Sequence, residues 1–312
     1  MYNDDYFVSV IIPNYCHSKF LDERIQSILG QTYQNFELII LDDCSPDDGA
    51  SRAIIEQYRD NPHVSHIIYN NVNSGSALLQ WDKGIGLAKG EIIWIAESDD
   101  SSDRSFLEKM LRFFFDEEVV MAFCKSLFYD VNGGKTDYKS QAILRNSFVL
   151  KGSDFIKNCL KQNIVANASG ALFRKSVASS VSPIYKSMKA VGDWMFWILL
   201  AEKGKVAFLN ECLNFFRTHD FNSTPKYAIN GISFKEQYVI YRYKVDAGYY
   251  NGLYKYWFCL AKVSAFENKQ FESEELKKEI MNLWDKNHIY IHFTPIYRFL
   301  NHILRLIRKK GQ

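Results

Sequence analysis

Residues 7–43 read FVSVIIPNYCHSKFLDERIQSILGQTYQNFELIILDD, and this stretch decides the fold class. The apolar run 7–12 predicts a buried strand. Apolar residues at helical spacing over 20–29 predict a helix that Gly30 ends, and the apolar run 36–41 predicts a second strand. A strand, a helix and another strand in this order indicate a βαβ unit around a largely parallel sheet.

The same alternation continues along the chain. It predicts a helix at about 49–59, a strand at about 64–69, a helix at about 76–88 and a strand over 91–96. A helix near 103–115 and a strand near 119–124 are expected to follow. The expected fold class is therefore α/β, with a mostly parallel sheet flanked by helices.

Acidic residues follow two of these strands. Asp42-Asp43 closes the strand over 36–41, and Glu97-Ser98-Asp99-Asp100 closes the strand over 91–96. Ligands of open α/β sheets bind at the carboxyl ends of the strands. Carboxylates can face an anionic nucleoside diphosphate only through a bridging cation, and Mg²⁺ or Mn²⁺ takes carboxylate and phosphate oxygens. The alternative is that these acids only form turns and cap helices.

Composition and motif searches remove several function classes. The formal net charge is +2, so no global field attracts nucleic acid, and the six Cys contain no CxxC pair. Gly84-x-Gly86 resembles part of a dinucleotide fingerprint, but it closes a predicted helix instead of opening one. The acidic N-terminus and short apolar runs predict no signal peptide or membrane span, and a cytoplasmic location is expected.

Several ordered motifs are similar to one known family. The run over 8–49, Asn73-x-Gly75 and the run AKGEIIWIAESDD over 88–100 resemble family 2 glycosyltransferases of GT-A fold. The segment VGDWMFW over 191–197 resembles the family's general-base segment, and FRTH over 216–219 its closing Arg-x-His. The resemblance covers about residues 7–224, and it implies an inverting transferase that uses a nucleotide sugar and a divalent cation, Mn²⁺ or Mg²⁺.

The resemblance also implies roles for residues of the donor side. Pro13 and Tyr15 would line the base and ribose, and Asp43 would bind the base beside Asp42. Glu97-Ser98-Asp99 occupies the DxD position. The residues implied to bind the donor are Pro13, Tyr15, Asp42, Asp43, Gly75, Glu97 and Asp99.

The metal and catalytic roles follow from the same resemblance. Asp99 would coordinate the cation, and His219 would contribute to the metal site. Asp193 matches the catalytic base that takes the proton of the acceptor hydroxyl. Without the family pattern, Asp193 reads as a first-turn acid favoured by the helix dipole, and His219 as a surface or core histidine. His17, His63 and His66 form no recognisable constellation.

The sequence departs from the family pattern at three places. The first acid of DxD is Glu97, Gly192 replaces the acid before the base, and Trp81-Asp82 stands where an Arg-Asn pair is common. A catalytically inactive nucleotide-sugar-binding protein is therefore an alternative function. A nucleotidyltransferase is a second alternative, although no Gly/Lys-rich phosphate loop is present.

The expected domains are a glycosyltransferase domain over 1–224 and a helical extension over 225–312. Within the first, about 1–100 would bind the nucleotide sugar and about 101–224 the acceptor. Residues 286–312 predict a basic amphipathic helix, which either contacts a membrane surface or packs on the domain. The expected partners are a donor, with a UDP-sugar favoured, and a glycan or lipid-linked glycan acceptor of bacterial surface polysaccharide or O-antigen synthesis.

Overall fold

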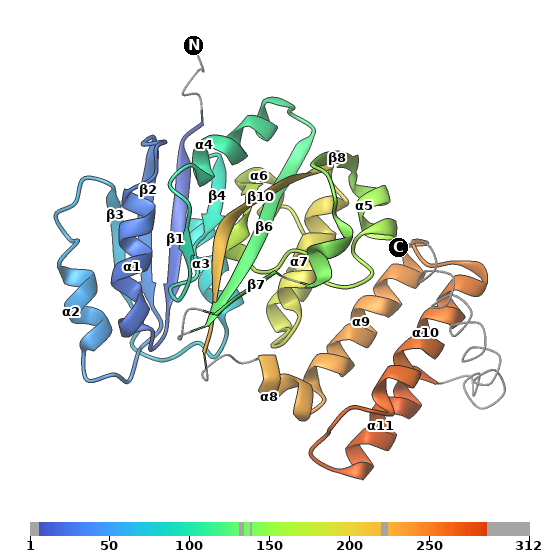
Figure 1. Cartoon of the computed structure of the whole chain (residues 1–312). Coiled ribbons are helices and arrows are strands. Elements are labelled where there is room, and N and C mark those ends of the chain that lie inside the picture. Colours follow the sequence, from blue (N-terminus) through green and yellow to red (C-terminus); the bar gives the residue numbers. More distant parts are fainter. Residues whose placement is uncertain (1–5, 131–133, 138, 220–223, 286–312) are drawn as a thin grey trace. The chain divides into compact units, whose positions relative to one another are not determined.

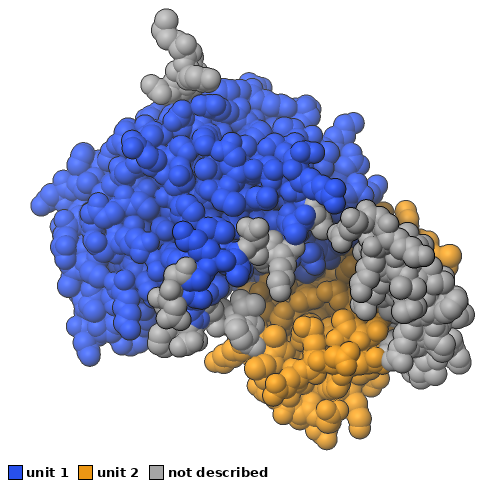
Figure 2. Space-filling model, in the orientation of Figure 1, with its two compact units in different colours: residues 1–187, 192–221 blue, residues 188–191, 222–312 orange. Residues whose placement is uncertain are grey.

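The computed structural model describes residues 6–130, 134–137, 139–219 and 224–285. The chain divides into two compact units, coloured separately in Figure 2. The first consists of residues 1–187 and 192–221, and it contains the sheet. The second consists of residues 188–191 and 222–312, and its described part is helical.

The elements are named in chain order. The strands are β1 (Val8–Asn14), β2 (Phe36–Asp42), β3 (Val64–Tyr69), β4 (Ile92–Ile95), β5 (Ser101–Ser102), β6 (Val119–Asp130), β7 (Lys135–Asp137), β8 (Phe148–Lys151), β9 (Ala171–Arg174) and β10 (Lys205–Thr218). The helices of the first unit are α1 (Ser18–Leu29), α2 (Ala50–Glu56), α3 (Ala77–Leu87), α4 (Phe106–Leu111), α5 (Gly152–Asn158), α6 (Lys175–Ala178) and α7 (Gly192–Ala201). Short 3-10 helices are η1 (Arg112–Phe115), η2 (Lys139–Ile143), η3 (Ala168–Gly170) and η4 (Pro183–Ser187). The second unit holds α8 (Thr224–Ile229), α9 (Ile232–Asp246), α10 (Gly252–Phe266) and α11 (Glu274–Trp284).

Within the described residues the strands form one ten-stranded sheet, with the order β3-β2-β1-β4-β9-β6-β10-β5. Strand β7 pairs with β6, and β8 pairs with β10. Strands β3, β2, β1 and β4 run parallel, whereas β9 runs antiparallel to both β4 and β6 (Figure 1). The α/β class and the mostly parallel arrangement of the N-terminal strands are confirmed.

The register of β1 brings the two acidic clusters to one edge. Asn14 lies opposite Asp42 on β2, and Ile11 lies opposite Ile95 on β4. Because these three strands are parallel and aligned, the loops that follow them leave the sheet at the same edge. The loop after β1 therefore meets the loops that carry the predicted acids.

Both faces of β1 are buried, since its side chains alternate between two helical layers. Val8, Val10 and Ile12 join the core formed with α1, α2 and α4. On the other face Ile11 meets α3 so closely that a Cβ built on Gly84 would lie 2.4 Å from Ile11 Cγ2. The glycine of the apparent dinucleotide motif thus serves helix–sheet packing.

The predicted boundaries differ from the observed ones in places. The helix expected near 103–115 is α4 followed by η1, and it begins at Phe106. Strand β6 continues well beyond the predicted 119–124, because its parallel pairing with β10 extends to Asp130. Gly30 ends α1 as predicted, but its φ is −82°, so it caps through its N–H to Gln26 and not through a left-handed turn.

The second unit has an aromatic core built from α9, α10 and α11, with Phe234, Tyr241, Tyr250, Phe266 and Trp284 among its buried residues. Among the described residues, none of the helices combines the length and apolar composition needed to cross a bilayer. The predicted basic amphipathic helix over 286–312 lies outside the described residues.

Candidate functional site

The loops after β1 and β2 are tied together by the Asp42 carboxylate. It accepts hydrogen bonds from Asn14 Nδ2 at 2.7 Å, from Ser45 N at 3.0 Å and from Ser45 Oγ at 2.7 Å. Pro13 is buried inside β1, whereas the side chain of Tyr15 is 45% exposed just beyond the strand. Asp42 therefore fixes the two loops to each other, and the Tyr15 side chain is exposed to a ligand at this edge.

Asp43 is buried and points into the segment before and within α3. Its carboxylate accepts hydrogen bonds from Asn70, Asn73, Ser74 and Gln80, at 2.6–3.1 Å. Gly75 follows with a φ of +73°, a conformation that favours glycine. A base that bound Asp43 directly would compete with these donors, so direct base recognition by Asp43 stays a prediction.

Glu97, the first acid of the DxD-like motif, is held by a residue of α3. Trp81 Nε1 donates to Glu97 Oε1 at 2.9 Å. Burial, with the nearby Asp99 and Asp100 charges, raises the pKa of Glu97 to about 8. The ring of Trp81 also packs on Phe196 and Trp197 of α7, with centroids 6.1 Å apart in both pairs. Trp81 thus connects the acidic motif to the helix that carries Asp193.

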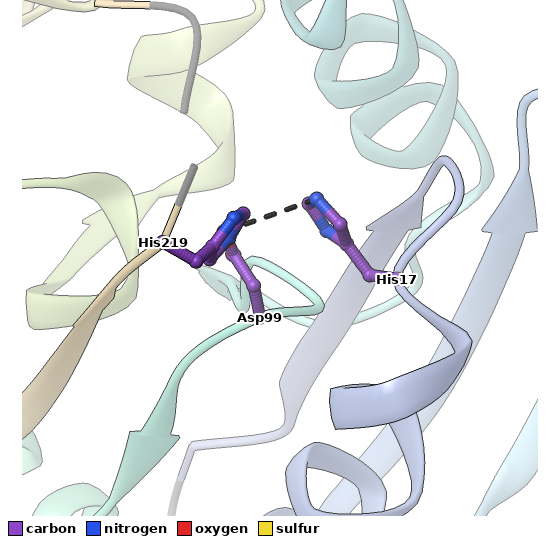
Figure 3. Close-up of side chains that lie close together, drawn as sticks. All are labelled: His17, Asp99 and His219. Atoms are coloured by element: carbon purple, nitrogen blue, oxygen red, sulfur yellow. Dashed lines mark hydrogen bonds and ion pairs between the residues drawn. The ribbon is translucent and has the colours of Figure 1, made fainter. Parts of the chain in front are cut away.

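Asp99 lies between two histidines that are distant in sequence, as Figure 3 shows. His219 Nε2 lies 3.0 Å from Asp99 Oδ2, and His17 Nε2 lies 4.0 Å from the same oxygen. The side chains of Asp99, His219 and His17 are 14%, 4% and 25% exposed. Burial raises the pKa of Asp99, but the contact with His219 and the nearby His17 outweigh it and hold that pKa below its usual value.

The three residues form a candidate cation site, since ligand atoms of all three lie within 4.8 Å of one another. Each offers one donor atom of a kind that dications accept. Burial lowers the pKa of His17, with the neighbouring His219 adding to it against the opposing charge of Asp99. Since metal binding requires neutral imidazole, this environment suits a ligand.

Two further charged residues, Asp100 and Arg24, lie near Glu97 and Asp99. Asp100 accepts hydrogen bonds from Asn167, Ser169 Oγ and the Arg217 N–H, and burial raises its pKa to about 7. The buried guanidinium of Arg24 lies 4.9 Å from the Trp94 ring, and burial lowers the pKa of Arg24 to about 10. Arg24 therefore places a positive charge near the carboxylates of Asp100, Glu97 and Asp99.

Arg217 belongs to the Arg-x-His motif and holds the backbone of Asp99 in position. Its Nε donates to the backbone oxygen of Asp99 at 3.0 Å, and its Nη2 reaches Glu23 Oε2 at 2.6 Å. Strand β10 thus delivers both His219 and an arginine that fixes the backbone of Asp99.

Asp193 lies in the first turn of α7, and its carboxylate accepts a hydrogen bond from Asn163 Nδ2 at 2.7 Å. Gly192 before it is buried. Asn163 thus contacts Asp193 through its amide, whereas Gly192 supplies no acid at the position before it. Trp194 and Trp197, which follow Asp193 on α7, are buried in the core.

The structure brings Asp99 and His219 together, and it adds residues that the sequence pattern did not single out. The view that His17 belongs to no constellation is wrong, because its ring contacts the acidic motif. A lone histidine carries no spacing signal, and only the alignment of β1 with β4 places it there. Trp81, Asn163 and Arg217 were likewise not assigned to the site.

An aligned parallel sheet with carboxylates and imidazoles at its carboxyl edge is the architecture of an α/β protein that binds ligands at that edge. A profile described as "Glycosyl transferase family 2" matches residues 9–181. The chain therefore belongs to glycosyl transferase family 2, and it is a glycosyltransferase of GT-A fold.

Relatives of known name fit this family. TuaG of Bacillus subtilis (strain 168), to which a role as a glycosyltransferase of teichuronic acid biosynthesis is ascribed, is 28% identical over 211 residues, which are 67% of this chain and 78% of TuaG. The poly(ribitol-phosphate) β-N-acetylglucosaminyltransferase TarP of Staphylococcus aureus (strain N315) is 26% identical over 252 residues, 80% of this chain and 74% of TarP.

Solved structures share the fold. S. aureus TarS 1-349 in complex with UDP-GlcNAc superposes with a TM-score of 0.58 at 16% identity, over 89% of this chain and 71% of that one. The mannosyltransferase PcManGT from Pyrobaculum calidifontis, in complex with GDP-Man and Mn²⁺, gives a TM-score of 0.59 at 14% identity, over 95% of this chain and 85% of that one.

Proposed function

We propose that this glycosyltransferase moves a sugar, with inversion, from a nucleoside-diphosphate sugar to a hydroxyl of a glycan or lipid-linked glycan of a bacterial surface polymer. The observation that carries the proposal is the contact of Asp99 with His219, which joins the DxD-like motif to the end of β10. Relatives ascribed to cell-wall polymer synthesis support the acceptor class. The UDP-GlcNAc complex of a structural neighbour supports a UDP-sugar as donor.

The donor would lie at the carboxyl edge of β1, β2 and β4. Tyr15 would face the base and ribose, and Asp42 and Asp43 would hold the loops around them in place. Glu97, fixed by Trp81, would accept a hydrogen bond from a hydroxyl of the donor. These roles require that the loops at this edge are ordered before the donor binds, and the hydrogen bonds of Asp42 and Asp43 hold those loops.

Asp99 and His219 would hold the divalent cation, because a carboxylate oxygen and an imidazole nitrogen 3.0 Å apart are both donor atoms that divalent metal ions accept. When bound, such a cation stabilises the negative charge that develops on the leaving diphosphate. Arg217 keeps Asp99 in position through the backbone.

Asp193 would act as the general base. The acceptor oxygen forms a bond to the anomeric carbon as the bond from that carbon to the diphosphate oxygen breaks, and the hydroxyl proton passes to the Asp193 carboxylate. The hydrogen bond from Asn163 Nδ2 holds the Asp193 carboxylate in position. Attack from the side opposite the diphosphate inverts the configuration.

The test is release of nucleoside diphosphate from UDP-, GDP- and dTDP-sugars with an extracted surface-polymer acceptor. Asp193→Asn should lower kcat about 100-fold or more, since it removes general-base catalysis, while nucleotide binding is retained. Asp154→Asn is the matched control, because Asp154 is also an acid in the first turn of a helix, α5. Equal turnover of Asp193→Asn and wild type would refute the assignment, and nucleotide binding without turnover in the wild type would favour a non-catalytic binding protein.

Peripheral contact with the cytoplasmic face of a membrane through residues 286–312 is part of the same proposal. Its support is the basic amphipathic pattern of that segment. Binding of the full chain to vesicles with anionic lipids, compared with neutral vesicles, tests it.

A further inference from the structure

His17 occupies a position where its side chain would ordinarily serve the helix. It is the N-cap residue of α1, where Ser, Thr, Asp or Asn is preferred because the side chain can bond the first amides. The His17 ring makes no such bond, and its backbone oxygen accepts the N–H groups of Phe20 and Leu21 instead. The ring is therefore available for another purpose.

The ring is held by the acidic motif itself. His17 Nδ1 lies 2.8 Å from Ser98 Oγ, and Ser98 is the middle residue of Glu97-Ser98-Asp99. This contact leaves Nε2, 4.0 Å from Asp99 Oδ2, as the ring atom that faces the carboxylate. Histidines that bind metal ions commonly have their other ring nitrogen fixed by a hydrogen bond in this way.

The aromatic surroundings fix the relation of the two histidines. The rings of His17 and His219 meet edge to face with centroids 5.4 Å apart, and Phe20 stacks on His219 at 5.2 Å. In Figure 3 the His17 ring points toward the place where the His219 ring and the Asp99 side chain meet. Ligand atoms of the three residues lie within 4.8 Å of one another.

The first acid of the motif is not a member of this cluster. Glu97 Oε1 accepts the indole N–H of Trp81, and the group of candidate ligands among the described residues is His17, Asp99 and His219. A set of two imidazoles and one carboxylate differs from an all-oxygen set. Imidazole suits transition-metal dications, whereas Mg²⁺ prefers oxygen ligands.

We propose that His17 is a third protein ligand of the cation site, and that the His17–Asp99–His219 centre selects a transition-metal dication over Mg²⁺. This inference rests on the proposed function, in which Asp99 and His219 hold the cation. It assigns to His17 a role beyond the motif residues that the family pattern implies.

The test measures metal binding by the full chain without a sugar donor. Protein freed of metal is titrated with Mn²⁺, followed by the electron paramagnetic resonance of free Mn²⁺, and with Mg²⁺ in competition. The variants are His17→Gln and, as the matched control, His66→Gln, which changes a half-buried histidine on β3. The visible absorption of the Co²⁺-loaded wild type reports nitrogen ligands directly.

The expected result is tighter binding of Mn²⁺ and Co²⁺ than of Mg²⁺ by the wild type. His17→Gln should weaken Mn²⁺ binding about tenfold or more, with the Mg²⁺ affinity little changed, and the control should match the wild type. Ser98→Ala keeps the imidazole but removes its hydrogen-bond partner, so it should weaken Co²⁺ binding in the same direction. This variant keeps the proposal testable if His17→Gln does not fold.

Unchanged Mn²⁺ affinity in a folded His17→Gln protein would overturn the inference, as would equal affinity of the wild type for Mg²⁺ and Mn²⁺. If the wild type still releases nucleoside diphosphate in that case, the proposed function stands and only the role of His17 fails. If His17→Gln loses Mn²⁺ binding but the wild type turns over no donor, the metal centre is supported and the proposed function fails.

Discussion

The contact between Trp81 and Glu97 allows a sharp test, because the chain contains a matched tryptophan without such a contact. Trp81 is buried, donates its Nε1–H to Glu97 Oε1 and packs on Phe196 and Trp197. Trp197 is also buried and packs on Phe196, but its Nε1 has no hydrogen-bond partner among the described residues. Changing each to Phe makes the same chemical change in two neighbouring rings of one cluster.

The expected magnitudes follow from burial and bonding. Trp→Phe in a packed site leaves a cavity of about 40 Å³, which costs about 1 kcal/mol. Trp81→Phe also leaves a buried carboxyl oxygen without its donor, which adds about 1 to 3 kcal/mol. We therefore expect a loss of about 2 to 4 kcal/mol for Trp81→Phe and about 1 kcal/mol for Trp197→Phe.

The assay is urea unfolding at pH 7 followed by far-UV circular dichroism, with both variants and the wild type compared at the same protein concentration. A second pair of the same Phe variants in a Glu97→Met background isolates the hydrogen bond, because there the difference between the two variants should vanish. Equal losses in the wild-type background would refute the reasoning, since the contact would then contribute nothing beyond packing.

Three further predictions concern stability. Burial, with the nearby Lys262 charge, lowers the pKa of Lys244 to about 7 from 10.5, so the unfolded chain binds more protons between these values. Stability of the second unit should rise as the pH increases from 7 to 10.5, and Lys244→Met should reduce that rise in hydrogen exchange of α9, while Lys262, whose pKa burial lowers to about 8, accounts for the remainder. Glu236 accepts the backbone N–H groups of residues 189–191, so Glu236→Gln should lower the free energy of unfolding by about 1 to 2 kcal/mol in urea denaturation, and an unchanged value would contradict this. Cys16 has a φ of 60°, a backbone conformation that Asn tolerates better than β-branched residues do. Cys16→Asn should therefore raise the free energy of unfolding by about 0.5 to 1 kcal/mol and Cys16→Val should lower it, measured as opposite shifts of the urea midpoint.

The pattern of apolar and acidic residues was enough to predict the strands whose ends form the candidate site. The strands over 36–41 and 91–96 are apolar runs that end in acids, and a parallel sheet necessarily brings such ends together. The match of residues 9–181 to the family confirms the resemblance that these motifs suggested. The proximity of Asp99 and His219 agrees with the metal site that the resemblance implied.

The side-chain contacts within the site could not be predicted, because they depend on the register of neighbouring strands and on how far each side chain reaches. His17 meets Asp99 because β1 aligns with β4, and nothing in the spacing of residue 17 encodes that alignment. The Trp81–Glu97 bond requires α3 to approach β1 within the space left by Gly84. Three of the four residues that donate to Asp43, namely Asn70, Asn73 and Ser74, come from a loop whose conformation no periodicity describes. Each of these features arises from tertiary contacts between segments that are separate in sequence.

The departures from the family pattern bear on how the charge of a donor diphosphate would be met. Where the family commonly has an Arg-Asn pair, this chain has Trp81-Asp82. Asp82 pairs with Lys186 at 2.5 Å, and Lys83, the cation of α3, donates to Asn70 Oδ1, so both cations already have partners. A diphosphate at this edge would then depend more strongly on a bound cation. A dication held by one carboxylate and two neutral imidazoles keeps a net positive charge, whereas two carboxylates would neutralise it. We therefore expect this chain to depend on its cation for donor binding more strongly than a relative that retains the arginine.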